Sequence, residues 1–288
     1  MRALVTGGRG FIGSHIVDAL DEVGVSVTVL DNGLSGANEN PGADYGEDAD
    51  ENDIRFSFDV DQAFHWSEPD VVFHCAAIAR TPWCIEDPVL CYETNVMGTL
   101  NVLEAARREM TVNGRAVRVV LSSSNITLAA PTPYWASKRA LEDMVEVYSK
   151  LYGVSVMALR YSNVYGERQS EEGLSPNVFA AFRKAKRETG RITLTGDGEQ
   201  TRDFTHVTDI VRGNLLAGNS KWCGVLDLCT GRNVTMNYVA RELFGSDVEY
   251  IDERVGDVKH IVQDPGRAKE ILGWVPIIRL EDGIKDVL

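Results

Sequence analysis

A tyrosine and a lysine stand four residues apart in the segment Tyr134-Trp135-Ala136-Ser137-Lys138. On a helix this spacing places both side chains on one face. A phenol with an ordinary pKa of about 10 is a poor base at neutral pH, but a nearby ammonium group favours the phenolate and lowers that pKa. The pair therefore predicts a general base that takes a hydroxyl proton while a hydride leaves the same carbon.

Three serines, Ser122-Ser123-Ser124, close an apolar segment shortly before this pair. A serine hydroxyl at the end of a strand can bridge the substrate oxygen and Tyr134 and so share the proton. The chain has no Gly-x-Ser-x-Gly motif, so a serine hydrolase is not indicated. Which of the serines acts is left open by the spacing alone.

A glycine-rich turn, Thr6-Gly7-Gly8-Arg9-Gly10-Phe11-Ile12-Gly13, follows the first apolar segment and opens a helical pattern. Its glycines permit a tight turn and a close approach of the backbone to a pyrophosphate, which the free N–H groups of the helix N-terminus bind. In this strand–turn–helix context the motif predicts a dinucleotide site. We expect the site to include Gly7, Gly10, Phe11, Ile12 and Gly13.

Further residues extend this site along the predicted strand ends. Asp31 ends the second strand, where its carboxylate can bind the adenosine ribose and would repel a 2′-phosphate, so NAD is favoured over NADP. Asp59 and Val60, after the third predicted strand, offer a carboxylate and a backbone N–H to the adenine edge. The small residues Ala76 and Ala77 leave room for the cofactor across the strand ends.

Short apolar segments alternate with helical patterns through the first half of the chain, which predicts a doubly wound parallel α/β sheet, the Rossmann arrangement. The predicted strands are Ala3–Thr6, Ser26–Asp31, Ile54–Phe58, Val71–His74, Val117–Ser122 and Ser155–Arg160. The predicted helices between them are Gly10–Val23, Thr94–Arg108 and Pro133–Leu151. The polar segment Asn32–Asp53 is predicted to be a solvated loop.

The second half predicts a smaller C-terminal substrate-binding domain packed on the carboxyl edge of the sheet. It contains a predicted helix at Asn177–Thr189, a strand at Arg191–Thr195 and a helix near Pro265–Leu272. We expect residues 1–160 to form the NAD-binding domain, with 203–231 returning to it. Residues 161–202 and 232–288 are then the substrate-binding domain.

Composition excludes several classes of protein. The formal net charge of −14 over 288 residues argues against a nucleic-acid partner. No apolar segment is long enough to span a bilayer and the N-terminus has no signal-peptide pattern, so no membrane association and a cytoplasmic location are expected. The five cysteines, 75, 84, 91, 223 and 229, show no Cys-x-x-Cys spacing and are interpreted as reduced thiols, with no metal site.

Taken together, the motifs resemble the extended short-chain dehydrogenases, and within them the nucleotide-sugar epimerases of the UDP-glucose 4-epimerase type. The segments that carry the resemblance are TGGRGFIG (6–13), Asp31-Asn32, HCAA (74–77), TNVMGTLNVLEAAR (94–107), SSS (122–124), YWASK (134–138), LRYSNVYG (159–166), GDGEQTRDFTHVTD (196–209), RVGDV (254–258) and LGWVP (272–276). They run almost from one end of the chain to the other.

The resemblance implies a role for each matching residue. Tyr134 is the base and Lys138 binds the nicotinamide ribose, while Ser124 contacts the substrate and assists proton transfer. Asn32, Asn95 and Ser122 join the NAD site. The residues implied to bind the diphosphate, sugar or nucleoside ribose of the substrate are Asn163, Asn177, Arg202, Arg254 and Asp257. Arginine suits these anions because its planar fork donates two hydrogen bonds at once.

The chain departs from the family between Ser124 and Tyr134, which are only ten residues apart. Related dehydratases and decarboxylases carry acidic residues after the active-site serine, whereas Asn125 and Ile126 supply none. We therefore expect a nucleotide-sugar 4-epimerase that acts on a UDP-hexose, its N-acetyl analogue or its uronate. A one-way dehydrogenase or ketoreductase and a non-catalytic dinucleotide sensor remain alternatives. The family also implies a homodimer.

Overall fold

Six parallel strands form the main sheet in the order β2-β1-β3-β4-β5-β9. They are β1 (Arg2–Thr6), β2 (Ser26–Leu30), β3 (Val71–His74), β4 (Arg118–Ser124), β5 (Ser155–Tyr161) and β9 (Gly224–Leu228). The structure is a computed structural model, and it describes residues 1–34, 42–44, 52–129, 131–169, 178–253 and 258–288. From β1, the chain adds β2 on one side and β3 and the later strands on the other. The carboxyl ends of β1 and β3 therefore flank a crevice.

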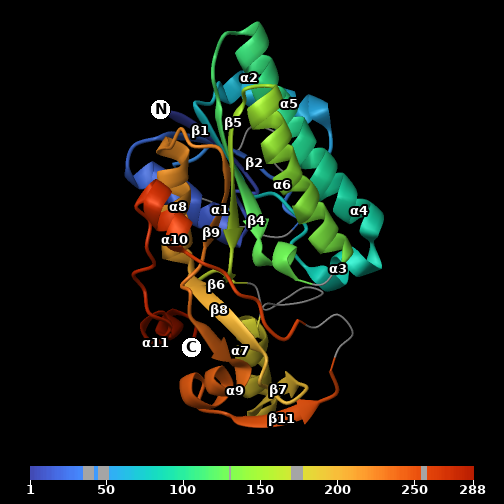
Figure 1. The fold of residues 1–288 in the computed structure, drawn as a ribbon, viewed down its shortest axis with the longest axis vertical. Coiled ribbons are helices and arrows are strands. Elements are labelled where there is room, and N and C mark those ends of the chain that lie inside the picture. Colours follow the sequence, from blue (N-terminus) through green and yellow to red (C-terminus); the bar gives the residue numbers. More distant parts are fainter. Residues whose placement is uncertain (35–41, 45–51, 130, 170–177, 254–257) are drawn as a thin grey trace.

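Helices cover both faces of the main sheet (Figure 1). One face carries α1 (Phe11–Glu22), α8 (Val207–Asn219) and α10 (Gly266–Leu272), and the other carries α2 (Ser57–Ser67), α5 (Gly98–Val112) and α6 (Pro133–Leu151). Each face has its own apolar core, since buried residues of one strand alternate between the two. Between β3 and α5 lie α3 (Thr81–Glu86), α4 (Pro88–Tyr92) and the π-helical segment η1 (Glu93–Met97).

A smaller lobe continues from the carboxyl end of β5 (Figure 1). It contains a three-stranded sheet of β10 (Asn233–Thr235), β8 (Thr201–His206) and β6 (Asn163–Tyr165), and a parallel pair of β11 (Asp247–Ile251) and β7 (Arg191–Thr195). Its helical elements are α7 (Val178–Thr189), α9 (Met236–Tyr238), η3 (Val239–Leu243), α11 (Leu280–Gly283) and η4 (Ile284–Asp286). An aromatic core built around Tyr165, Phe179 and Phe204 holds this lobe together.

The doubly wound parallel sheet predicted from the sequence is confirmed. The C-terminal lobe and its strand at Arg191–Thr195 are also present. After the lobe has begun with β6, the chain returns through α8 and β9 to the main sheet. The domain boundaries themselves stay a prediction.

The prediction of a strand at Ile54–Phe58 is wrong, because this segment turns and then enters α2 at Ser57. The carboxylate of Asp53 accepts the backbone N–H of Arg55 at 2.8 Å and stabilises the turn. Phe56 and Phe58, which looked like buried strand residues, are 58% and 68% exposed. Asp44 takes the place beside β2 instead, through a single parallel bridge to Thr28.

Asp209 in α8 fastens the C-terminal segment to the main sheet. Its fully buried carboxylate accepts the backbone N–H groups of Ile277 at 3.0 Å and Ile278 at 2.9 Å, and its own carbonyl accepts the indole N–H of Trp274 at 2.8 Å. A guanidinium from Arg212 pairs with the same carboxylate at 2.7 Å. Three donors thus compensate the buried carboxylate, as burial of a charge requires.

Replacing this carboxylate should destabilise the whole protein. We expect Asp209→Asn to lower the free energy of unfolding by about 3 kcal/mol, because the amide cannot accept from every donor and the Arg212 charge loses its partner. Asp282, whose side chain is 66% exposed, is the matched control, and Asp282→Asn should cost less than about 1 kcal/mol. Urea denaturation followed by circular dichroism measures both, and equal losses in the two variants would contradict the role given to Asp209.

Candidate active site

A cleft of about 720 Å³ runs along the carboxyl ends of the main strands and under the smaller lobe. Its floor comes from the segments that follow β1, β2, β3 and β4, and its far wall comes from β6, α7 and β8. The residues lining it include the glycine turn, Asp31, Ala76, Ala77, Ser122, Ser124, Tyr134, Lys138 and Asn163. Segments that are distant in the sequence meet here because parallel strands end at one edge of the sheet.

The glycine turn lies directly against the backbone that follows β3. Gly7 has a φ of +71°, and a Cβ atom there would lie 2.5 Å from the backbone nitrogen of Ala76. A Cβ atom on Gly13 would lie 2.0 Å from the carbonyl oxygen of Gly7. Gly10 is the N-cap of α1 and has no side chain to cap it, so the first N–H groups of the helix face the cleft. This arrangement fits a dinucleotide pyrophosphate.

Asp31 stands at the end of β2, on the rim of the same cleft. Its carboxylate accepts the backbone N–H groups of Arg9 and Gly33, each at 2.8 Å. Two backbone donors hold the carboxylate at the position predicted for the adenosine ribose. The adjoining Asn32 also lines the cleft and donates from its amide to Asp53 at 2.9 Å.

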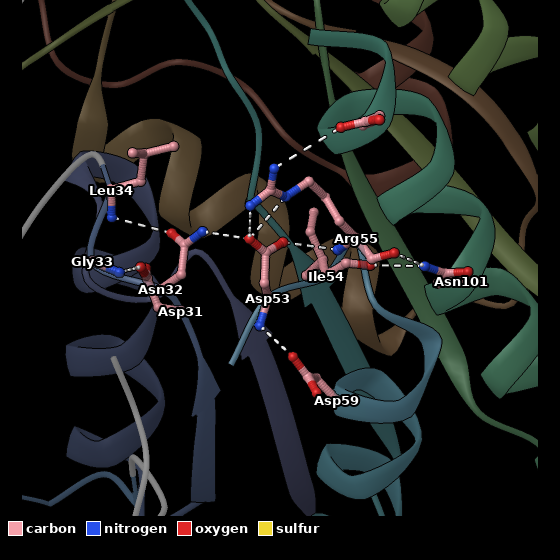
Figure 2. Close-up of polar contacts among 10 residues, drawn as sticks. Asp31, Asn32, Gly33, Leu34, Asp53, Ile54, Arg55, Asp59 and Asn101 are labelled. Atoms are coloured by element: carbon pink, nitrogen blue, oxygen red, sulfur yellow. Dashed lines mark hydrogen bonds and ion pairs between the residues drawn. The ribbon is translucent and has the colours of Figure 1, made fainter. Parts of the chain in front are cut away.

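The residues expected at the adenine edge, Asp59 and Val60, lie away from the surface of the cleft. Asn52, Asp53 and Ile54 line the cleft, whereas Asp59 and Val60 lie in α2 and are not among its lining residues. Figure 2 shows Asn32 and Arg55 directed at the Asp53 carboxylate, and Asp59 accepting the backbone N–H of Asp53 at 2.9 Å. Asp59 therefore acts on the cleft only through Asp53.

Asp53 is charged despite its burial. Burial by itself would raise the pKa of this carboxyl group, but hydrogen bonds from Arg55 and Asn32 outweigh it and hold the pKa below its ordinary value. Arg55 forms an ion pair with it at 2.7 Å. Sequence reasoning missed this residue because it placed Asp53 at the end of the solvated loop and the following residues in a strand, although the Asp-x-Arg spacing is typical of a turn.

Asn95 was expected near the cofactor, and the structure buries it behind the cleft. Its side-chain amide forms two hydrogen bonds with the backbone of Ile78: it accepts the N–H of Ile78 at 2.8 Å and donates to the carbonyl of Ile78 at 3.0 Å. Ile78 lines the cleft, while Asn95 itself is not among the lining residues. Asn95 thus supports the wall of the cleft from η1, and its neighbour Thr94 reaches the surface of the cleft.

Tyr134, Ser124 and Lys138 come together at the end of β4. Tyr134 and Lys138 lie in the first turns of α6, and the Lys138 ammonium is 6.0 Å from the centre of the Tyr134 ring. Lys138 also donates to the backbone carbonyl of Ser122 at 2.7 Å. Thr132 caps the N-terminus of α6 by accepting the N–H of Trp135 at 3.1 Å, which fixes where the helix begins and hence where Tyr134 lies.

Burial controls the proton affinities of these groups. It raises the pKa of the Tyr134 phenol to about 12, against the opposing effects of a hydrogen bond with Ser124 and the charge of Arg80. It lowers the pKa of the Lys138 ammonium to about 8. Burial therefore favours the neutral form of both groups: the protonated phenol and the deprotonated amine. A positive charge placed beside the phenol would favour the phenolate.

A buried ion pair holds the serine segment in place from behind. Arg160 of β5 donates to both carboxylate oxygens of Glu142 in α6, each at 2.7 Å, and Ser123 donates to the same carboxylate at 2.7 Å. All three serines border the cleft, but side chains alternate along β4, and the Ser123 hydroxyl is bound to Glu142 while those of Ser122 and Ser124 are on the opposite face of the strand.

The residues predicted to bind the substrate differ in where the structure places them. Asn163 lines the cleft and donates to the carbonyl of Asp203 at 3.0 Å. Arg202 is half-buried in β8, is not among the lining residues, and donates to the Thr201 carbonyl at 2.8 Å. Asn177, Arg254 and Asp257 lie outside the described residues.

The described helices include none that is long and apolar enough to cross a membrane. Nowhere in the described part of the chain do three or more His, Cys, Asp or Glu side chains lie in an arrangement that could hold a metal ion.

A doubly wound sheet with a glycine turn, a carboxylate after β2 and a Tyr–Lys pair behind a serine defines an enzyme of the extended short-chain dehydrogenase type. The model of the NAD dependent epimerase/dehydratase family matches residues 3–222. The chain belongs to this family and is an NAD-dependent enzyme.

Similar proteins cover nearly the whole chain. It is 37% identical to a protein of Methanocaldococcus jannaschii provisionally named a UDP-glucose 4-epimerase, over 99% of this chain and 96% of that one. UDP-glucose 4-epimerase of Thermotoga maritima, solved with UDP-glucose, is 34% identical with a TM-score of 0.90 and coverages of 100% and 97%. UDP-glucuronic acid 4-epimerase of Bacillus cereus, solved with UDP-glucuronic acid and NAD, is 26% identical with a TM-score of 0.84 and coverages of 100% and 98%.

The raised pKa of Tyr134 can be measured directly. In the NAD-free protein we expect no tyrosinate from Tyr134 between about pH 9 and pH 10.5, because burial disfavours the charged phenolate. Saturation with NAD⁺ should bring its ionisation to lower pH, since the nicotinamide carries a positive charge. The measurement is ultraviolet difference absorbance against Tyr134→Phe, with circular dichroism to confirm folding. Ionisation of Tyr134 at or below pH 10 without NAD⁺ would contradict the effect of burial.

Proposed function

We propose that this protein is an NAD-dependent 4-epimerase of a UDP-hexose. The observation that carries the proposal is the placement of Tyr134, Ser124 and Lys138 in one cleft between the glycine turn and the smaller lobe. The named activities of the similar proteins from T. maritima and B. cereus support the same reaction class.

The cofactor residues fit NAD along the length of the cleft. Gly7, Gly10, Phe11, Ile12 and Gly13 would hold the pyrophosphate, as the close packing of the turn supports. Asp31 and Asn32 would hold the adenosine ribose. Asp53 and Ile54 would meet the adenine edge in place of Asp59 and Val60. Ala76, Ala77 and Ser122 would border the nicotinamide half, with Lys138 on its ribose.

Proton transfer is the work of the chain's own side chains. When bound, NAD supplies the acceptor and later the donor of the hydride at the sugar C4. Tyr134 takes the proton of the C4 hydroxyl and Ser124 bridges the two oxygens. The resulting 4-keto sugar turns over in the cleft, and Tyr134 returns the proton to the opposite epimer. No net redox change results.

The substrate's nucleotide end would lie under the smaller lobe. We propose that Asn163, Asn177, Arg202, Arg254 and Asp257 bind its diphosphate, sugar and ribose. Arginines in such a position recruit an anionic ligand to a protein of net charge −14. Asn125 in the position of the acidic residue of related decarboxylases and dehydratases disfavours those two reactions.

Two further predictions of the sequence are kept as proposals. A homodimer would pair copies through α6 and a neighbouring helix, and the exposed Val147 and Leu151 near the end of α6 support an apolar contact there. A cytoplasmic location is proposed from the five cysteines, none of which forms a disulfide.

The proposed reaction predicts interconversion of UDP-hexose epimers without net formation of NADH. Tyr134→Phe should lower kcat by roughly 1,000-fold while NAD binding is retained, because only the proton acceptor is lost. Chromatography of product isomers together with absorbance of NADH measures both. Net NADH formation would indicate a one-way dehydrogenase, and unchanged function in Tyr134→Phe would indicate a non-catalytic protein.

The revised adenine site makes a separate prediction. Asp53→Asn should raise the dissociation constant of NAD about tenfold, because it disrupts the charge network that shapes this end of the cleft. Asp59→Asn is the matched control, since an asparagine can still accept the N–H of Asp53. Calorimetric titration of the NAD-free proteins gives both constants. A larger increase of the NAD dissociation constant in Asp59→Asn than in Asp53→Asn would indicate that Asp59 binds the adenine edge.

A further inference from the structure

Arg80 presents a charged side chain to the cleft that the proposed reaction does not use. It occupies the N-cap position of α3 and lines the cleft together with Trp83, Ile126 and Tyr134. Within the described part of the chain, no carboxylate forms an ion pair or hydrogen bond with its guanidinium. The side chain is largely desolvated, and burial lowers its pKa from the ordinary value, with only the Tyr134 phenol acting in the opposite direction.

The position of Arg80 along its segment shows which part of the cleft it serves. Ala76 packs against Gly7 at the pyrophosphate turn, and Arg80 follows four residues later beside Tyr134. The segment bends at Ala77 and ends at the N-cap of α3, and α3 packs against α6, the helix that carries Tyr134. Arg80 therefore lies at the reaction end of the cleft, away from the turn that fits the cofactor's phosphates.

Among the described residues that line the cleft, no carboxylate compensates the charge of Arg80. The acidic side chains among the described lining residues are Asp31 and Asp53, both at the adenosine end. Lys138 is a second cation among the described lining residues, and it donates to the Ser122 carbonyl. A desolvated charge without a partner is costly, so an arginine in this position indicates an anionic group on the ligand.

The chemistry of a hexose identifies which anion can reach it. Tyr134 must contact the oxygen on C4, and the exocyclic C6 is attached to C5, the direct neighbour of C4. The diphosphate is attached to C1, on the opposite side of the six-membered ring. A cation beside the phenol is therefore close to C6 and far from the diphosphate. An arginine fork matches a carboxylate with two parallel hydrogen bonds.

We propose that Arg80 binds the C6 carboxylate of a hexuronic acid and that the substrate of this enzyme is a UDP-hexuronate. The inference rests on the proposed 4-epimerase function and specifies its substrate. The B. cereus relative named UDP-glucuronic acid 4-epimerase supports the presence of this substrate class in the family. A neutral hydroxymethyl group at C6 would leave the guanidinium without its partner.

The test compares two substrates in the NAD-loaded full-length protein. For the wild type, kcat/KM for UDP-glucuronate should exceed that for UDP-glucose by roughly 100-fold. Arg80→Met, which keeps the length of the side chain and removes the charge, should reduce the ratio of the two values by a similar factor. Arg80→Lys should restore part of that ratio. Arg279→Met is the matched control, because Arg279 is exposed outside the cleft, and the ratio should not change.

The outcomes separate this inference from the proposed function. A wild-type preference for UDP-glucose overturns the inference and leaves the 4-epimerase in place. An equal loss of kcat/KM for both substrates in Arg80→Met also overturns the inference. It would indicate that Arg80 acts on Tyr134 and not on the C6 group of the substrate. If Arg80→Met does not fold by circular dichroism, Arg80→Gln and the wild-type preference still decide. Failure to interconvert any UDP-hexose or UDP-hexuronate overturns the proposed function itself.

Discussion

The close contact between the glycine turn and the backbone that follows β3 is the constraint on which the site depends. With a Cβ atom at Gly7 only 2.5 Å from the Ala76 nitrogen, any side chain there would push the turn away from the strand end. That contact sets the end of α1 toward the cleft and starts the segment that reaches Arg80 beside Tyr134. One steric condition thus aligns the phosphate-binding end and the reaction end of the same cleft.

Desolvation then determines the chemistry of the reaction end. Burial raises the pKa of Tyr134 to about 12, lowers that of Lys138 to about 8 and lowers that of His74 to about 3, so each group is driven toward its neutral form. The charge of Arg80 does not offset this effect of burial, so the phenol needs additional positive charge beside it to act as a base. The proton affinity of Tyr134 is thereby coupled to occupancy of the cleft, which limits proton transfer to the assembled complex.

Polar groups buried behind the cleft keep the reacting side chains in place. Glu142 joins α6, which carries Tyr134, to β5 and to the serine segment of β4 through Arg160 and Ser123. Asn95 brackets Ile78 in the wall that leads to Arg80. Asp209 fastens the C-terminal segment across α8. Each uses a side chain to satisfy backbone groups or charges that would otherwise be buried without a partner.

The amino-acid sequence by itself determined the parallel sheet, the glycine turn, Asp31 and the Tyr134–Lys138 pair, because strand burial, turn glycines and helical spacing are local patterns. It did not determine that Ile54–Phe58 would turn, since an apolar segment is a strand only if it has a neighbour to pair with, and Asp44 occupies that edge. Tertiary structure alone decided that Asp53 lines the cleft while Asp59 supports it. It also decided that Arg80 lines the cleft with Tyr134, with no carboxylate among the described residues paired to it, because residues from separate strand ends meet only when the sheet has formed.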